Sequence, residues 1–146
     1  MAEDAKDIDN RLLEASVEGN FKKVKELLDT GANIEVRNMD GETPLLMTSY
    51  NGYANITKLL LDRGANIEAT DYTCFTPLIN ACYCGYSKIT KLLLEKGANI
   101  CAKDMNNNSS LIRASIGGHT EIAKLLIKSG ADIETKNNNN HAPLMC

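Results

Sequence analysis

The chain has 146 residues and a net charge of −3, and its acidic and basic residues are interspersed without a basic block. This distribution argues against nucleic-acid binding, which needs clustered lysine and arginine. No apolar run approaches the length of a membrane span, and the acidic N-terminus lacks the apolar core of a secretory signal. With five cysteines and no such signal, we expect free thiols in an intracellular protein, cytoplasmic or nuclear, without membrane partners.

A pattern with a period of 33 residues runs along the chain. Four segments share it: NRLLEASVEGNFKKVKELLDTGA (10–32), TPLLMTSYNGYANITKLLLDRGA (43–65), TPLINACYCGYSKITKLLLEKGA (76–98) and SSLIRASIGGHTEIAKLLIKSGA (109–131). A fixed period of this length is typical of stacked repeats, none of which can bury its apolar face alone. We therefore predict one array over residues 1–146, with a first repeat at 7–39, further repeats at 40–72, 73–105 and 106–138, and the start of another at 139–146.

The first repeat has a polar side. Lys23 and Glu26 stand where the second repeat has Ile56 and Leu59. A terminal repeat needs a polar outer face, so we predict that residues 7–39 cap the array.

The third repeat illustrates the expected secondary structure. Thr76 is a good helix N-cap, and Pro77 suits the first helical position. Apolar residues then recur at helical spacing until Gly85. A second helix begins near Ser87 and ends at Gly97, which can adopt a left-handed conformation. Each unit is therefore predicted to be helix, turn, helix and a hairpin-like loop.

One position in each loop is expected to need a positive φ. Gly41 fills it in the first loop, whereas Cys74, Asn107 and Asn140 fill it in the others. Asparagine tolerates a positive φ fairly well and cysteine poorly. We therefore predict that Cys74→Gly stabilises the protein.

The C-terminal end shows no polar side like that of the first repeat. The last copy keeps the interior apolar pattern, and a new copy begins at Ala142-Pro143-Leu144. An array that stopped there would expose an apolar face to water. We therefore expect the chain to be part of a longer array or a larger protein, and to be a monomer unless its C-terminal face self-associates.

The repeated residues resemble the ankyrin repeat family. The shared pattern is T-P-L, two small residues, Gly, I-x-x-L-L and G-A, and it covers Asp7 to about Asn138. The resemblance implies an all-α solenoid of stacked helix-turn-helix units with projecting β-hairpin-like loops. The chain departs from the family where His usually follows T-P-L, because Leu46, Ile79 and Ile112 occupy that position.

No residues form a recognisable catalytic motif, so we expect no enzymatic activity and no cofactor. His119 lacks a partnered nucleophile motif and falls at a repeat position where Tyr53 and Tyr86 also occur, so we predict a structural role for it. The cysteine spacing around Cys82 and Cys84 matches no standard zinc pattern, so we predict no metal site.

The resemblance implies a protein partner on the concave face, which the loop tips and the exposed sides of the first helices form. Carried over by position, the predicted binding residues are Arg37, Met39, Asp40, Glu42, Tyr50, Asn51, Thr70, Tyr72, Thr73, Phe75, Tyr83, Cys84, Lys103, Met105, Asn106, Asn108 and Ile116. Four of the seven aromatic residues of the chain are among them, and aromatic side chains are enriched in protein interfaces. The alternative is that these rings only cover neighbouring loops.

The predicted function is a non-enzymatic protein-interaction module within a larger protein. Two alternatives remain open. The same face could inhibit or regulate a partner enzyme by covering its active site, or the repeats could recruit substrate to an enzyme that extends beyond residue 146.

Overall fold

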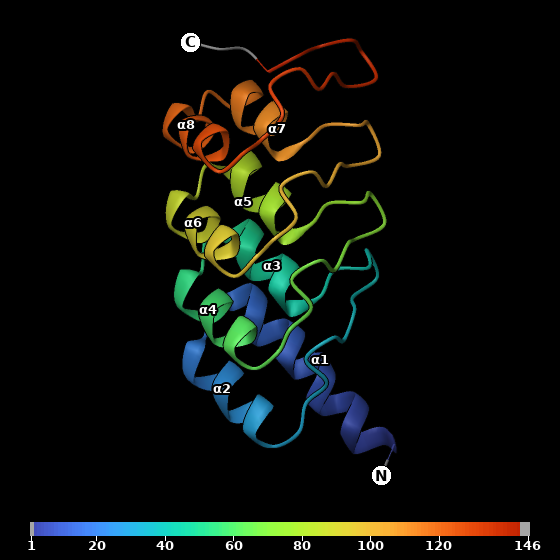
Figure 1. Ribbon diagram of the computed structural model, residues 1–146. Helices are drawn as coiled ribbons and strands as arrows, with labels where there is room; N and C mark the ends of the chain where they lie inside the picture. The colour runs from blue at the N-terminus through green and yellow to red at the C-terminus, as the bar shows by residue number, and fades with distance from the viewer. Residues whose placement is uncertain (1, 144–146) are drawn as a thin grey trace.

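The computed structural model describes residues 2–143 of the chain. The helices in this range are α1 (Ala2–Glu18), α2 (Phe21–Asp29), α3 (Pro44–Asn51), α4 (Ala54–Asp62), α5 (Pro77–Cys84), α6 (Ser87–Glu95), α7 (Ser110–Ile116) and α8 (Thr120–Lys128). Figure 1 shows them as helix pairs stacked along one direction, with the loops between pairs projecting to one side. Leu144, which is predicted to begin the apolar stripe of a further repeat, lies outside the described residues.

The helices form two layers. The first helices of the pairs (α1, α3, α5 and α7) pack successively against one another, and so do the second helices (α2, α4, α6 and α8). The two helices of each pair also contact each other. Residues 2–143 contain one isolated β-bridge, between Lys103 and Ser109, and no strand. The predicted all-α solenoid of helix-turn-helix units is confirmed.

Helices α3 and α5 begin and end where their sequence predicts, and α7 begins where its sequence predicts. The hydroxyls of Thr43, Thr76 and Ser109 accept hydrogen bonds from the backbone N–H groups three residues later, so each residue caps its helix. Gly52 and Gly85 end α3 and α5 in the left-handed conformation, with φ of +84° and +87°. The N-caps therefore start these short helices at equal intervals of 33 residues, which is what regular stacking requires.

The core consists of equivalent residues from successive repeats. Leu12, Leu45, Leu78 and Leu111 are each at most 1% exposed. The small residues that follow them in the first helices, such as Ala81 and Cys82, are also fully buried. Small side chains let neighbouring first helices approach closely. Leu12 and Leu45 belong to one hydrophobic cluster, and Leu78 and Leu111 belong to another.

Helix α1 differs from the other first helices. It begins at Ala2, before the predicted start of the first repeat at residue 7. The segment AEDAKD carries strong helix formers and no proline, whereas Pro44 and Pro77 fix the first turn of α3 and α5.

An aromatic ring covers a glycine at each junction between repeats. A Cβ added at Gly52 would lie 2.7 Å from the ring of Tyr86, and one added at Gly85 would lie 2.5 Å from the imidazole of His119. The imidazole Nε2 of His119 also lies 3.1 Å from the carbonyl oxygen of Tyr83. His119 therefore has the structural position that its place in the repeat predicts.

Acidic side chains bridge successive repeats. Glu35 accepts a hydrogen bond from the backbone N–H of Asn66 at 2.6 Å, and Glu68 accepts one from Asn99 at 2.7 Å. Cys101 occupies the next equivalent position and cannot supply a carboxylate.

Ion pairs join the second helices in the same way. Arg63 pairs with Asp29 at 2.8 Å and Lys96 with Asp62 at 2.9 Å. Hydrogen bonds from Lys58 and Lys96 lower the pKa of Asp62. The next equivalent position holds Ser129, so both series of bridges end before the junction between the third and fourth repeats.

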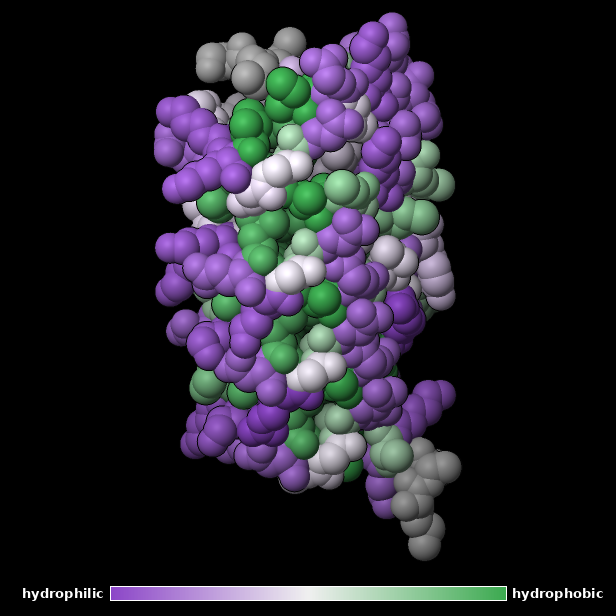
Figure 2. Space-filling model, viewed as in Figure 1, coloured by the Kyte–Doolittle hydropathy of each residue, from purple (hydrophilic) through white to green (hydrophobic). Residues whose placement is uncertain are grey.

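A band of hydrophobic residues runs along the array between hydrophilic borders (Figure 2). Half-buried aliphatic residues occur at the ends of the second helices and in the turns that follow them; between α6 and α8, Leu94, Ala98 and Ile100 line a shallow cleft. These three side chains pack against the core. The three residues are therefore the partly covered edge of the hydrophobic core and not a separate exposed patch.

Candidate functional site

The exposed large hydrophobic residues fall mostly into two rows. The helix row consists of Val17, Tyr50, Tyr83 and Ile116, one from each first helix at intervals of 33 residues. The loop row consists of Met39, Tyr72 and Met105, one from each of the first three loops at the same interval. Met39 is 95% exposed, Tyr72 71% and Met105 60%. Of the exposed large hydrophobic residues in the described part of the chain, only Phe21 and Ile133 lie outside the two rows.

Each loop is held by an asparagine or aspartate at its base. Asn38, Asp71, Asp104 and Asn137 occupy equivalent positions, and the Oδ1 atom of each accepts backbone N–H groups from the residues two and four positions later, at 2.8–3.0 Å. This is the local hydrogen bonding by which Asn and Asp stabilise turns. The loop tips are therefore fixed by residues in their own loops.

The position predicted to need a positive φ has one in every loop. Its φ is +79° at Gly41, +63° at Cys74 and Asn107, and +64° at Asn140. The aromatic ring of Tyr72 covers Gly41, where an added Cβ would lie 2.8 Å from the ring. One side of Tyr72 therefore packs on the preceding loop, although most of the residue is exposed.

Neighbouring loops are also hydrogen-bonded to one another. The backbone N–H of Tyr72 donates to the carbonyl of Asp40, and that of Met105 donates to the carbonyl of Thr73. The guanidinium of Arg37 donates to the carbonyls of Gly41 and Thr70 and so ties the first loop to the second. Arg37 thus has a structural role in addition to its predicted place on the binding face.

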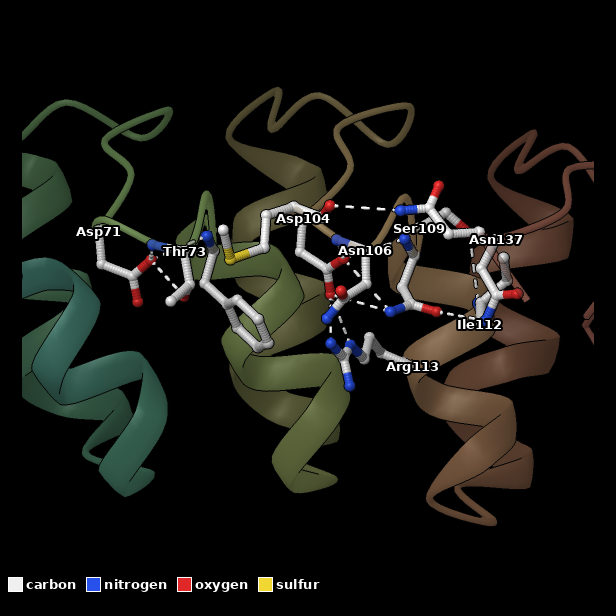
Figure 3. A network of polar contacts seen from close by, with 12 residues as sticks. Asp71, Thr73, Asp104, Asn106, Ser109, Ile112, Arg113 and Asn137 are labelled. Atoms are coloured by element: carbon white, nitrogen blue, oxygen red, sulfur yellow. Dashed lines mark hydrogen bonds and ion pairs between the residues drawn. The ribbon is translucent and has the colours of Figure 1, made fainter. Parts of the chain in front are cut away.

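A buried ion pair lies where the third loop meets α7 (Figure 3). The side chain of Asp104 is 0% exposed, and its Oδ2 lies 2.7 Å from Nε of Arg113. Asn108 donates from Nδ2 to both carboxylate oxygens of Asp104 and accepts a hydrogen bond from Asn137 at 2.8 Å. The network thereby connects the third loop to the fourth.

The same arginine contacts two predicted binding residues. The guanidinium carbon of Arg113 lies 4.9 Å from the ring centre of Phe75 and 5.4 Å from that of Tyr83. Phe75 and Tyr83 also pack edge to face, with ring centres 6.0 Å apart. Asp104 therefore fixes Arg113, and Arg113 fixes one side of Tyr83 while 42% of Tyr83 stays exposed.

Most of the predicted binding residues are at the surface. Those exposed are Arg37, Met39, Asp40, Tyr50, Asn51, Thr70, Tyr72, Thr73, Tyr83, Lys103, Met105, Asn106 and Ile116, and those half-buried are Glu42, Phe75 and Cys84. Asn108 is the exception, because it is only 4% exposed and its side-chain amide is taken up by Asp104 and Asn137. Sequence reasoning missed Asp104 and Arg113, although an arginine in a position occupied by Met47 and Asn80 in other repeats was a visible irregularity.

The cysteines in the described part of the chain, Cys74, Cys82, Cys84 and Cys101, are free thiols. Burial raises the pKa of Cys82 to about 12, and burial also raises the pKa of Cys84. Within residues 2–143, no cluster of His, Cys, Asp and Glu could hold a metal ion. The helices of this range are also too short or too polar to cross a membrane.

Comparison with protein families gives two overlapping matches. The family described as ankyrin repeats (3 copies) matches residues 12–104, and that described as ankyrin repeats (many copies) matches residues 86–127. A comparison with curated proteins gave no match. The first match spans more than half of the chain and agrees with the stacked helix pairs and loops, so this chain belongs to the ankyrin repeat family.

Proposed function

We propose that this chain is a non-enzymatic module that binds a protein partner through the helix row and the loop row, which together we term the recognition face. Ankyrin repeats are in general protein–protein interaction modules. The observation that carries the proposal is the regular exposure of Val17, Tyr50, Tyr83, Ile116, Met39, Tyr72 and Met105. A surface that served only solubility would not need large apolar side chains at equivalent positions of successive repeats.

The rigidity of the face supports the proposal. The turns are fixed by Asn and Asp side chains, and the loops are hydrogen-bonded to one another. Tyr83 is held by Phe75 and Arg113. A preorganised surface loses little conformational entropy on binding, and exposed aromatic anchors on such a surface can dominate the affinity.

The free thiols are relevant to the cellular compartment in which the protein acts. Cys74, Cys82, Cys84 and Cys101 form no disulfide among themselves. Free cysteines are typical of reducing compartments, which supports the proposal that the protein acts inside the cell.

The test is binding to an isolated partner. A partner captured with the wild-type chain would be purified, and its dissociation constant would be measured for the wild type, for Tyr50→Ala/Tyr83→Ala and for Phe21→Ala. Phe21 is a matched control, because it is 43% exposed but lies outside both rows. We expect the double variant to weaken binding at least about 100-fold, as the loss of two anchor residues does, and Phe21→Ala to leave it unchanged.

Tyr83 also contacts Phe75 and Arg113, so its replacement could disturb the fold. Circular dichroism would establish that the variants are folded. Wild-type affinity in a folded double variant would refute the proposed function. Loss of binding in Phe21→Ala alone would place the interface elsewhere.

A further inference from the structure

We propose that the partner segment bound by the recognition face is a proline-rich stretch in the polyproline II conformation, with basic residues at the end that lies over the first repeat. This inference rests on the proposed function, because it specifies the kind of protein segment that the same face binds. It depends on the spacing of the helix row, on its aromatic residues and on the position of the acidic side chains.

The spacing of the helix row matches a polyproline II segment. Val17, Tyr50, Tyr83 and Ile116 stand on first helices that pack successively against one another. Packed helices lie about 8–10 Å apart, so a ligand running along the row meets one apolar side chain at about that interval. A polyproline II helix returns to the same face every three residues, or about 9.3 Å.

Other regular conformations fit this interval less well. Side chains on one face of a β-strand recur at about 6.6–6.8 Å. An α-helix needs seven residues, or about 10.5 Å, to return to the same face. Of the three conformations, only the polyproline II repeat falls within the range of about 8–10 Å for packed helices.

The chemistry of the row agrees with its spacing. Tyr50 and Tyr83 of the helix row and Tyr72 of the neighbouring loop row are exposed, and surfaces lined with aromatic residues bind proline-rich polyproline II segments. The backbone carbonyls of such a segment have no internal hydrogen-bond partners, and a tyrosine hydroxyl can donate to them. An α-helical ligand would satisfy its own carbonyls and would make no use of these hydroxyls.

The charges on the face are unevenly distributed along the array. Glu14, Glu18, Asp40 and Glu42 belong to the first repeat and its loop, and the first three are exposed. In the later repeats the equivalent positions hold no acidic residue. The only arginine or lysine among them is Arg113, whose charge is paired with Asp104.

The cations near each end leave this polarity unchanged. Arg37 lies in the first loop, but its guanidinium is engaged by the carbonyls of Gly41 and Thr70. Lys103 and Lys136 are exposed in the third and fourth loops, but Asp132 and Glu134 are exposed there too. A hydrogen bond from the backbone of Glu134 and the positive charge of Lys103 both help to lower the pKa of Asp132. Basic residues of a ligand are therefore attracted to the acidic side chains of the first repeat, and the last loops carry no excess positive charge that would add to this preference.

The probe is a fluorescein-labelled peptide of four Leu-Pro-Pro triplets with three arginines at one end, made once with the arginines first and once with them last. One control peptide replaces the arginines with glutamates, and another replaces every proline with alanine. Fluorescence anisotropy at low salt would give the dissociation constant of each peptide for the whole chain.

We expect one of the arginine peptides to bind about tenfold more tightly than the glutamate peptide, which corresponds to a few exposed ion pairs. We expect Glu14→Gln/Glu18→Gln/Asp40→Asn to reduce this ratio below about threefold and Tyr50→Ala/Tyr83→Ala to abolish binding. Equal binding by the alanine peptide would overturn the inferred conformation, and an unchanged ratio in the triple variant would overturn the inferred polarity.

The two proposals can fail separately. If neither arginine peptide binds, but a captured partner still depends on Tyr50 and Tyr83, the inferred ligand class is wrong and the proposed function stands. If no partner depends on these tyrosines and no peptide binds, the proposed function fails with it.

Discussion

Replacing Arg113 with methionine should strongly destabilise the protein. The side chain of Asp104 is 0% exposed, and Arg113 is its ion-pair partner. Removal of one partner from a buried pair leaves an uncompensated charge and costs about 3–5 kcal/mol. Backbone N–H groups and the amide of Asn108 still donate to Asp104 in the variant, so we expect the lower end of this range. In a chain of this size, that corresponds to a fall in Tm of roughly 6–12 °C.

The chain itself supplies the compensating change. Asn38 in the first loop and Met47 in α3 occupy the positions of Asp104 and Arg113. Asn38 accepts the same two backbone hydrogen bonds without a charge, at 3.0 and 2.9 Å. The double variant Asp104→Asn/Arg113→Met should therefore recover stability to within about 1 kcal/mol of the wild type, since replacing both partners of a buried pair is often neutral.

Urea unfolding followed by far-UV circular dichroism would measure the free energy of unfolding for both single variants and the double variant. This double-mutant cycle isolates the interaction between the two side chains. A cost below about 1 kcal/mol for Arg113→Met would refute the reasoning, because the buried carboxylate would then not depend on its partner. The same conclusion would follow if the double variant were as unstable as Arg113→Met.

Three further predictions concern backbone strain, packing and ionisation. Cys74→Gly should raise the free energy of unfolding by about 0.5–1 kcal/mol, because it relieves a φ of +63° at some entropic cost; a lower Tm would contradict this. Gly85→Ala should lower the free energy of unfolding by at least about 1 kcal/mol more than Gly97→Ala, as thermal unfolding would show. Both glycines have a φ of +87°, but only at Gly85 would the added Cβ meet the imidazole of His119, at 2.5 Å. Equal losses of stability would show that the ring moves freely. Burial raises the pKa of the Cys82 thiol from 9.0 to about 12, so this group favours folding below about pH 9 and loses that contribution as the pH rises toward 12. At pH 9, iodoacetamide should therefore modify the exposed Cys74 but not Cys82 in the folded protein. Peptide mass mapping would measure this, and equal modification would mean that Cys82 is accessible.

The fold could be predicted because the pattern that encodes it is repeated. Thr76 and Pro77 predict a helix start from local chemistry alone, and the equivalent residues of other repeats give the same prediction. The positive φ of Cys74 and Asn107 also follows from comparison with Gly41 within the chain. Such features depend only on residues close in sequence, which is why no structure was needed to find them.

The contacts between loops and helices could not be predicted in the same way. Asn108 was expected on the binding face because its repeat position matches that of Glu42, but Asp104 and Asn137 draw it into the interior. Arg113 lies in the fourth repeat and contacts Phe75 and Tyr83 of the third. These interactions depend on which side chains differ between repeats, and a repeated pattern carries no information about its own irregularities. For the same reason, the repeated pattern could not predict that Arg37 connects two loops through a hydrogen bond to the carbonyl of Thr70.

The end of the bridging series at Cys101 and Ser129 has a consequence for local unfolding. At the earlier junctions, the carboxylates of Glu35 and Glu68 and the ion pairs of Asp29 and Asp62 resist separation of the second helices. At the last junction of the described chain, apolar packing holds α8 against α6, and His119 at the start of α8 contacts the carbonyl of Tyr83, whereas the amide network holds the fourth loop. Amide protons of α8 should thus exchange with deuterium before those of α4 and α6, through an opening of the outer layer that leaves the loops in place.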